Sequence, residues 1–175
     1  NPFKKDKPGT PVVGERIAVL TSESEIEIDP ATAALPFTLP AAVENEDWSQ
    51  SGGNASKSMG HVALGTSLGT AWSVSIGEGN NRSARLASAP VIGGGRVYTI
   101  DTAGTVRAFD ARNGGQVWSA SFGDGSRDTN YGGGVAYDNG RVYATNGNGF
   151  VAALDAATGG AAWTVKPGGP LRGAA

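Results

Sequence analysis

The 175-residue sequence contains no cysteine. Within these residues that excludes disulfide bonds, thiolate metal sites and cysteine nucleophiles, and it leaves the redox compartment open. An excess of charge of one sign is also lacking, because 14 lysines and arginines stand against 16 aspartates and glutamates. Neutralising nucleic-acid phosphates requires clustered basic side chains, so nucleic acid is not expected as a partner.

Long apolar runs are missing as well. No stretch approaches the roughly 20 residues that a bilayer-spanning helix needs, and no signal peptide is visible, which leaves export open. Aromatic residues make up only 7% of the chain. Glycine, in contrast, supplies 28 residues, about twice its usual share of roughly 7%. Abundant glycine without collagen periodicity indicates many tight turns, as in an all-β protein of short strands.

Two stretches of the chain repeat each other at an offset of 45 residues, so that Arg96-Val97-Tyr98 recurs as Arg141-Val142-Tyr143. The same offset relates Gly104 to Gly149, Val106 to Val151, Ala108 to Ala153, Asp110 to Asp155, Gly114 to Gly159 and Trp118 to Trp163. Four short strands joined by hairpins fill a unit of this length, which is the content of one propeller blade. The sequence therefore predicts an all-β fold, a β-propeller of four-stranded antiparallel blades forming a partial ring of about three blades.

Each repeat contains an Asp-x-x-x-Gly turn. The carboxylates of Asp110 and Asp155 can accept backbone N–H groups just ahead of them and close the turn. Gly114 and Gly159 can supply the positive φ that such a turn requires. The two aspartates could also be read as catalytic carboxylates, but their identical position in consecutive repeats favours turn closure.

A tryptophan follows each of these aspartates by eight residues, at Trp118 and Trp163. Trp72 precedes Trp118 by 46 residues and marks a weaker copy of the repeat. These indoles could stack on a flat quinone, yet one tryptophan per repeat at a fixed position is typical of packing between neighbouring sheets. We therefore predict that Trp118 and Trp163 are buried between blades.

Other candidate sites are weaker. His61 is the only histidine and lacks a ligand motif, so a packing or surface position is favoured over metal binding. The glycine runs at 93–95 and 132–134 do not open helices, which argues against phosphate binding. No catalytic, cofactor or metal site is predicted.

The repeats divide the chain into consecutive segments. We expect a flexible tether at 1–12, degenerate repeat strands at 13–40, a connection at 41–60, a partial blade at 61–88, blades at 89–132 and 133–168, and the start of another connection at 169–175. Within the two blades, strands are expected at about 89–122 and 133–166. The degenerate copy contains Ile28-Asp29-Pro30-Ala31-Thr32-Ala33, which is similar to the turn that begins at Leu154.

The stretch from Ala153 to Trp163 reads Ala-Leu-Asp-Ala-Ala-Thr-Gly-Gly-Ala-Ala-Trp and resembles the repeat of pyrroloquinoline-quinone-type propellers. That repeat identifies a superfamily more than a function, because quinoprotein dehydrogenases and non-catalytic scaffolds share it. Two further stretches resemble the BamB family of lipoproteins, which are subunits of the outer-membrane β-barrel assembly machinery. Residues 1–8 look like the tether that follows a lipidated cysteine, and Leu171-Arg172-Gly173 is similar to a connection between blades.

The BamB resemblance carries several implications. It implies a complete ring of eight blades, no catalysis or cofactor, and a place on the periplasmic face of the bacterial outer membrane through a lipid anchor not present in this chain. It also implies docking on the periplasmic POTRA domains of BamA, with Leu171 and Arg172 in the docking surface. An apolar anchor beside a multi-donor arginine suits such an interface.

Two alternatives stay open. One is a fragment of a quinone-dependent dehydrogenase, although those enzymes typically add a vicinal disulfide over the cofactor, a calcium site and a base aspartate. The other is a generic protein-interaction propeller with different partners.

Overall fold

The computed structural model describes residues 28–125, 132–171 and 173. The chain divides into two compact units, Asn1–Thr38 and Leu39–Ala175. In the described part of the first unit, Asp29 caps a four-residue helix, α1 (Pro30–Ala33), by accepting the backbone N–H groups of Ala31 and Thr32. No helix among the described residues is long and apolar enough to cross a bilayer.

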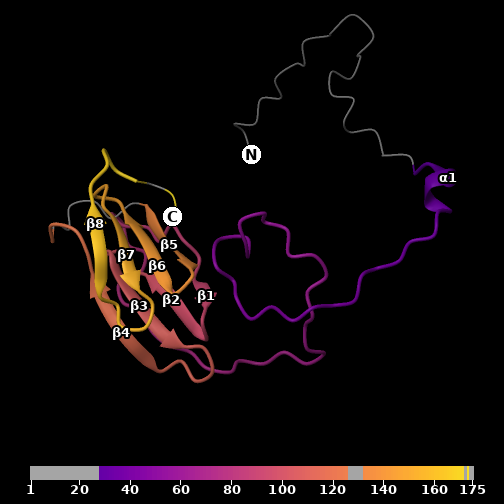
Figure 1. Cartoon of the computed structure of the whole chain (residues 1–175), viewed down its shortest axis with the longest axis horizontal. Helices are drawn as coiled ribbons and strands as arrows, with labels where there is room; N and C mark the ends of the chain where they lie inside the picture. Colours follow the sequence, from indigo (N-terminus) through magenta and orange to yellow (C-terminus); the bar gives the residue numbers. More distant parts are fainter. Residues whose placement is uncertain (1–27, 126–131, 172, 174–175) are drawn as a thin grey trace, which may run out of the picture. The chain divides into compact units, whose positions relative to one another are not determined.

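The second unit contains two four-stranded antiparallel sheets whose strand order follows the chain (Figure 1). The first sheet consists of β1 (Val91–Gly93), β2 (Arg96–Ile100), β3 (Thr105–Asp110) and β4 (Gln116–Ser121). The second consists of β5 (Gly133–Asp138), β6 (Arg141–Asn146), β7 (Val151–Asp155) and β8 (Ala161–Val165). These strands lie within the two ranges expected from the repeat, so the predicted all-β blade fold is confirmed.

The first hairpin of each blade closes in the same way. Gly94 and Gly95 join β1 to β2 with φ values of 57° and 72°, and Asn139 and Gly140 join β5 to β6 with 43° and 75°. Two consecutive positive φ values define a turn whose twist matches that of the flanking strands. Glycine and asparagine adopt them at low steric cost, which explains their presence at these four positions.

A β-bulge recurs between the last two strands of each blade. In the first blade Ala108 pairs with Trp118 and Phe109 pairs with Gln116, so Val117 is the additional residue. In the second blade the corresponding shift follows the pairing of Ala153 with Trp163. Each bulge therefore lies immediately before the repeat tryptophan and sets its side-chain direction.

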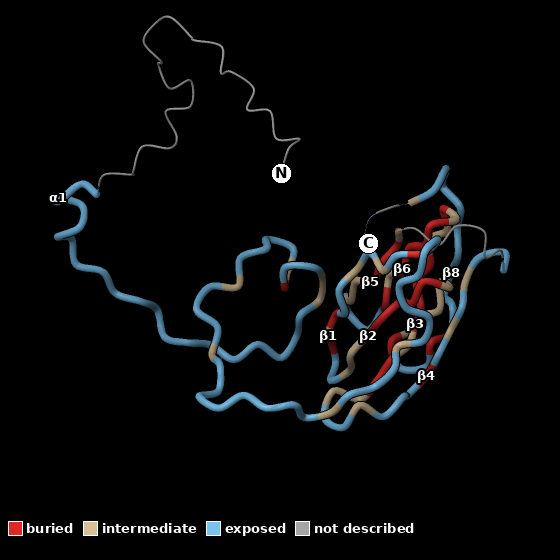
Figure 2. The backbone as a smooth tube through the Cα atoms, turned by 180° about the vertical axis from the view of Figure 1, so that it is seen from behind, coloured by how far each residue is buried: buried red, intermediate tan, exposed pale blue. Residues whose placement is uncertain are grey.

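The hydrophobic core lies between the two sheets, where the buried segments of the strands face each other (Figure 2). It contains Val91, Tyr98, Ile100, Val106, Ala108, Trp118, Val135, Val142, Ala144, Ala152, Leu154 and Ala156. Tyr137 extends this core by stacking on Tyr98, with ring centroids 5.7 Å apart. The Tyr137 ring crosses Gly93 so closely that an added Cβ there would lie 2.0 Å from it, so only glycine fits.

The chain before the first blade is partly attached to the sheets. Trp48 forms an isolated antiparallel bridge with Ile92 of β1, and the Ser49 carbonyl accepts the N–H of Tyr137 in β5 at 2.7 Å. Residues 61–88 were expected to form a partial blade, but they contain no strand, only isolated bridge positions. His61 is exposed, and its Nδ1 lies 2.8 Å from the Pro40 carbonyl oxygen.

Candidate partner-binding surface and the contacts between blades

Asp110 and Asp155 close the turns that precede β4 and β8. One carboxylate oxygen of Asp155 accepts the N–H of Ala157 at 3.0 Å and both the N–H and the hydroxyl of Thr158 at 2.9 Å. Asp110 accepts the N–H groups of Arg112 and Asn113 at 2.8 and 3.3 Å. The hydrogen bond from the Thr158 hydroxyl, followed by that from its backbone, lowers the pKa of Asp155. Both carboxylates are engaged in turn closure, as the repeat predicted.

A tryptophan indole from the preceding segment packs against the glycine that ends each of these turns. Gly114 and Gly159 have φ values of 72° and 76°. A Cβ added at Gly114 would lie 2.7 Å from the Trp72 ring, and one added at Gly159 would lie 2.7 Å from the Trp118 ring. We call this contact between a repeat tryptophan and the next Asp-x-x-x-Gly turn the blade lock.

A hydrogen bond completes each blade lock. Trp72 Nε1 donates to the Ala111 carbonyl at 3.0 Å, and Trp118 Nε1 donates to the Ala156 carbonyl at 2.9 Å. In both cases the acceptor is the residue directly after the turn aspartate. The segment around Trp72 therefore contacts the first blade as β4 contacts the second, although it forms no sheet.

Trp163 differs from the other two tryptophans. The prediction of burial is confirmed for Trp118, which is 8% exposed, and is wrong for Trp163, which is 44% exposed. The reason lies outside the repeat that contains it, because burial of a repeat tryptophan requires the turn of the following repeat. Among the described residues, no Asp-x-x-x-Gly turn lies against Trp163.

The Ala156 carbonyl is the polar centre of the interface between blades. Besides Trp118, it accepts a hydrogen bond from Arg96 Nη1 at 3.1 Å and a longer one from the Tyr98 hydroxyl at 3.4 Å. Burial is the largest influence on Tyr98 and raises the pKa of its hydroxyl. One backbone oxygen of the second blade thus binds three side chains of the first.

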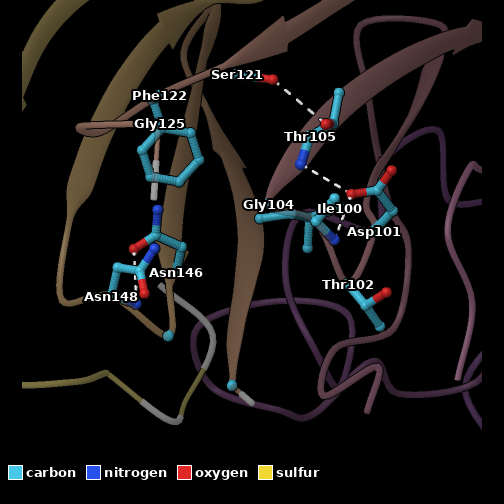
Figure 3. A pocket seen from close by; sticks show the side chains of 13 residues that line it. Ile100, Asp101, Thr102, Gly104, Thr105, Ser121, Phe122, Gly125, Asn146 and Asn148 are labelled. Atoms are coloured by element: carbon cyan, nitrogen blue, oxygen red, sulfur yellow. Dashed lines mark hydrogen bonds between the residues drawn. The ribbon is translucent and has the colours of Figure 1, made fainter. Parts of the chain in front are cut away.

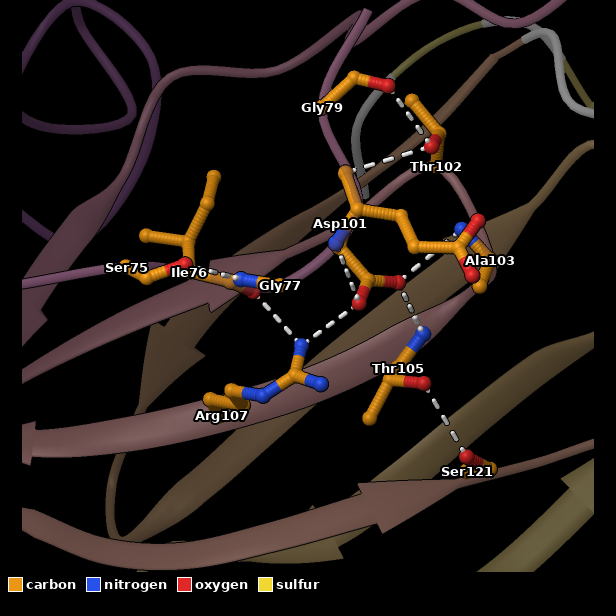
Figure 4. A network of polar contacts seen from close by, with 11 residues as sticks. Ser75, Ile76, Gly77, Gly79, Asp101, Thr102, Ala103, Thr105, Arg107 and Ser121 are labelled. Carbon is orange, nitrogen blue, oxygen red and sulfur yellow. Dashed lines mark hydrogen bonds and ion pairs between the residues drawn. The ribbon is translucent and has the colours of Figure 1, made fainter.

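At the opposite end of the blades lies a surface that we call the connection face. Among the described residues, it consists of the β2–β3 turn, the β6–β7 turn, the connecting segments 76–79, 122–125 and 166–171, and residue 173. In its first half, the Arg107 guanidinium lies between the Asp101 carboxylate at 2.6 Å and the Ile76 carbonyl at 2.5 Å (Figure 4). Asp101 also accepts the N–H groups of Ala103, Thr105 and Glu78.

The sequence analysis did not single out this ion pair. The positions of Asp101 and Arg107 correspond to Asn146 and Ala152 in the second blade, so the pair is not repeated. A signal for the turn itself was present, since Asp101 and Asn146 both precede a glycine by three residues. The side chain of Asp101 is 1% exposed, and its charge is balanced by Arg107 and by backbone donors.

A pocket of about 150 Å³ opens on the connection face between the two turns (Figure 3). Its wall is mainly polar, with Asp101 and Thr105 on one side and Phe122 and Asn146 on the other. The Asn146 side-chain oxygen accepts the backbone N–H groups of Asn148 and Phe150, each at 3.1 Å, so it serves its own turn. Among the described residues there is no cluster of side chains suited to a metal ion.

The segment after β8 returns across the β6–β7 turn. The carbonyl of Gly169 approaches Gly149, where an added Cβ would lie 2.6 Å from it. Farther along, the Thr145 hydroxyl donates to the Gly173 carbonyl at 2.8 Å. Leu171 lies between these two attachments and is half-buried. Arg172, its predicted companion in partner binding, lies outside the described residues.

Comparison with known proteins agrees with this architecture. A family model described as outer membrane protein assembly factor BamB matches residues 102–175. The outer membrane protein assembly factor BamB of Alkalilimnicola ehrlichii is 38% identical over 65 residues, which are 37% of this chain. That alignment spans 17% of the relative's length, so the chain matches about a sixth of that protein.

The fold is also similar to those of solved structures outside the BamB family. Quinohemoprotein alcohol dehydrogenase from Comamonas testosteroni is 26% identical with a TM-score of 0.56, covering 71% of this chain and 20% of the enzyme. A europium-containing methanol dehydrogenase is 22% identical with a TM-score of 0.62, covering 74% of this chain and 25% of that protein. The sheets and their repeats define the chain as part of a β-propeller with repeats of the pyrroloquinoline-quinone type. Within that class, residues 102–175 are similar to the BamB family.

Proposed function

We propose that this chain is part of a non-catalytic scaffold that supports the assembly of outer-membrane β-barrel proteins. It would bind the periplasmic POTRA domains of BamA from the periplasmic face of the outer membrane, where a lipid anchor would hold the full-length protein. The observation that carries the proposal is the match of residues 102–175 to a family described as an outer membrane protein assembly factor.

The hydrogen bonds of the repeat carboxylates support a binding role for the chain. Asp110 and Asp155 are the acidic residues that both repeats share at one position, and both accept backbone hydrogen bonds in their own turns. A general base needs a carboxylate that can reach a substrate proton, and these two serve turn geometry instead. A rigid pair of blades with short turns is, in contrast, a suitable platform for a protein partner.

The connection after β8 supports Leu171 and Arg172 as the contact. The described residues of the segment contact the β6–β7 turn on both sides of Leu171, at Gly149 and at Thr145, which restricts the position of Leu171. Preorganisation lowers the entropy cost of binding. A half-buried leucine on such a segment retains enough surface to contact a partner, and an adjacent arginine can provide several hydrogen-bond donors.

The test is capture of the BamA periplasmic domains by the full-length protein and by a Leu171→Ala, Arg172→Glu variant. Loss of a central anchor typically costs about 2 kcal/mol, or about thirtyfold in affinity. We expect at least that loss in the variant, with an unchanged melting temperature.

The matched control is a Leu68→Ala, Arg112→Glu variant, which makes the same chemical changes at two exposed positions outside the connection. It should bind like the unmodified protein. If the melting temperature of the Leu171, Arg172 variant falls while capture per folded molecule is retained, the two residues are structural and the proposed contact is wrong.

A second candidate function is quinone-dependent dehydrogenation, favoured by the 26% identity to quinohemoprotein alcohol dehydrogenase over 71% of the chain. Titration of the protein with pyrroloquinoline quinone and calcium, followed by absorbance and calorimetry, separates the two functions. Saturable binding of the quinone would favour the enzyme. No heat and no spectral change, together with capture of the BamA domains, would favour the scaffold.

A further inference from the structure

One buried hydroxyl joins the second blade to the connection that follows it. Thr145 lies near the end of β6, and the residue is 7% exposed. Its hydroxyl oxygen accepts the backbone N–H of Gly134 in β5 at 3.1 Å, and the hydroxyl donates to the Gly173 carbonyl at 2.8 Å. A hydroxyl group carries a single proton. Here that proton binds the connection, while the oxygen binds the sheet.

The surroundings of Thr145 determine the direction of this bond. Threonine is β-branched, so few side-chain rotamers are open to it. The N–H of Gly134 approaches a lone pair of the hydroxyl oxygen, so the hydroxyl proton must point away from β5. Because Thr145 is almost fully buried, water has little access to the hydroxyl, which strengthens the bond that it donates.

The equivalent position of the first blade carries no hydroxyl. At the 45-residue offset Thr145 corresponds to Ile100, whose side chain belongs to the hydrophobic core. Both blades nevertheless form four-stranded antiparallel sheets of the same strand order. A hydroxyl at this position is therefore not needed to build a blade, and its presence in the second blade requires another explanation.

The bond from Thr145 reaches the connection two residues beyond Leu171. On the other side of Leu171, the carbonyl of Gly169 lies against Gly149, where an added Cβ would be 2.6 Å from it. Leu171 is half-buried between these two contacts. The Thr145 bond therefore restricts the position of Leu171, although the Thr145 side chain is itself too buried to contact a partner.

We propose that Thr145 is a positioning residue for partner binding, which holds the connection around Leu171 in the conformation that the partner recognises. This inference rests on the proposed function, since it takes Leu171 and Arg172 as the contact. Thr145 acts through the Gly173 carbonyl and does not touch the partner. Without the hydroxyl, the free connection samples more conformations, and ordering it on binding then lowers the affinity.

The experiment replaces Thr145 in the full-length protein by valine and by serine. Valine keeps the shape of threonine without its hydroxyl, whereas serine keeps the hydroxyl. Affinity for the BamA periplasmic domains is measured per folded molecule, because valine also leaves the Gly134 N–H without this acceptor. We expect about fivefold weaker binding for Thr145→Val, the usual effect of one hydrogen bond, and nearly unchanged binding for Thr145→Ser.

Thr99→Val is the matched control. Thr99 lies on β2 and is 4% exposed, and among the described residues its hydroxyl has no hydrogen-bond partner. The same substitution therefore removes a buried hydroxyl that holds no segment, and binding should stay unchanged.

Trypsin provides a readout that does not need the partner. It cleaves after arginine, so the rate of cleavage between Arg172 and Gly173 reports how freely the connection opens. Cleavage after Arg112, which is exposed, is the internal reference for a general loosening of the fold. Thr145→Val should raise the rate at Arg172 several-fold relative to the rate at Arg112, and Thr145→Ser should not.

A double-mutant cycle separates positioning from stabilisation of the sheet. In the Leu171→Ala, Arg172→Glu background the proposed contact is already removed, so Thr145→Val should weaken binding no further. Equal fold losses of affinity in the two backgrounds would show that Thr145 does not act through this contact, and the inference would be overturned.

Failure of the proposed function gives a different pattern of results. The unmodified protein would then not bind the BamA domains, while Thr145→Val would still raise tryptic cleavage at Arg172. That pattern would refute the proposed partner and support Thr145 as the residue that positions the connection. An unchanged cleavage rate at Arg172 in Thr145→Val would refute the positioning itself.

Discussion

At the scale of single residues, Trp118 and Trp163 occupy the same position of the repeat but differ in burial and therefore in their contribution to stability. Both follow an Asp-x-x-x-Gly turn and both adjoin a bulge, yet their exposed fractions are 8% and 44%. Among the described residues, the turn at Gly159 covers the Trp118 indole and no such turn covers that of Trp163. The position of a residue in the repeat determines where its side chain points. Whether that side chain is buried depends on the neighbouring repeat.

Replacement of Trp118 by alanine should be strongly destabilising. The substitution removes a buried indole, its hydrogen bond to Ala156 and its packing on Gly159. We expect a loss of about 3–5 kcal/mol in the free energy of unfolding, as for other core aromatics. Trp163→Ala should cost under about 2 kcal/mol because much of its side chain is already solvated. Urea denaturation of the two variants checks both values, and equal costs would contradict the blade lock.

Tyr98 makes stability depend on pH in the alkaline range. Burial raises the pKa of its hydroxyl above the ordinary value of 10.0. The unfolded chain therefore releases this proton at a lower pH than the folded chain does. The contribution of Tyr98 is fully present below about pH 10 and is lost as the pH rises through the raised folded-state value.

The corresponding measurement is the free energy of unfolding of the unmodified protein and of Tyr98→Phe between about pH 8 and about pH 11. The unmodified protein should lose stability more steeply above about pH 10 than the phenylalanine variant does. Parallel curves would show that the Tyr98 hydroxyl does not carry the effect.

At the scale of elements, the Asp-x-x-x-Gly turn has two functions at once. It reverses the chain between the last two strands of a blade, and it receives the tryptophan of the preceding segment. The aspartate supports the first function and the glycine supports both, because its positive φ shapes the turn and its missing Cβ admits the indole.

Gly159→Val tests this double function. Valine at a φ of 76° is strained by about 1–3 kcal/mol, and its Cβ would also displace the Trp118 ring. The total loss of stability should therefore exceed the strain alone, and Trp118 fluorescence should shift toward that of an exposed indole. Gly160→Ala is the control, since Gly160 lacks a positive φ and faces only the Thr158 side chain. Full stability of Gly159→Val would refute the turn assignment.

At the scale of the whole molecule, the fold was predictable because its information is local and repeated. The offset between Arg96 and Arg141 located both blades, and the turn aspartates and glycines marked their hairpins. The same regularity extends to Asp29, which accepts the N–H groups of Ala31 and Thr32 as Asp155 accepts those of Ala157 and Thr158.

Features that occur once could not be predicted in this way. The bridge between Trp48 and Ile92 joins segments with no common repeat, and the pair formed by Asp101 and Arg107 has no counterpart in the second blade. The exposure of Trp163 depends on a contact between repeats. Periodicity shows which residues are equivalent, but it does not show which equivalents have a neighbour.

The blade lock also gives the repeat a polarity. Each of the two described blades carries an indole on one side and a glycine turn on the other, so the two observed contacts both run head to tail. A gene duplication that copies one whole repeat in frame therefore creates a matching donor and acceptor in a single event. A copied repeat therefore brings both halves of its contact with it, and neither half needs a compensating mutation elsewhere.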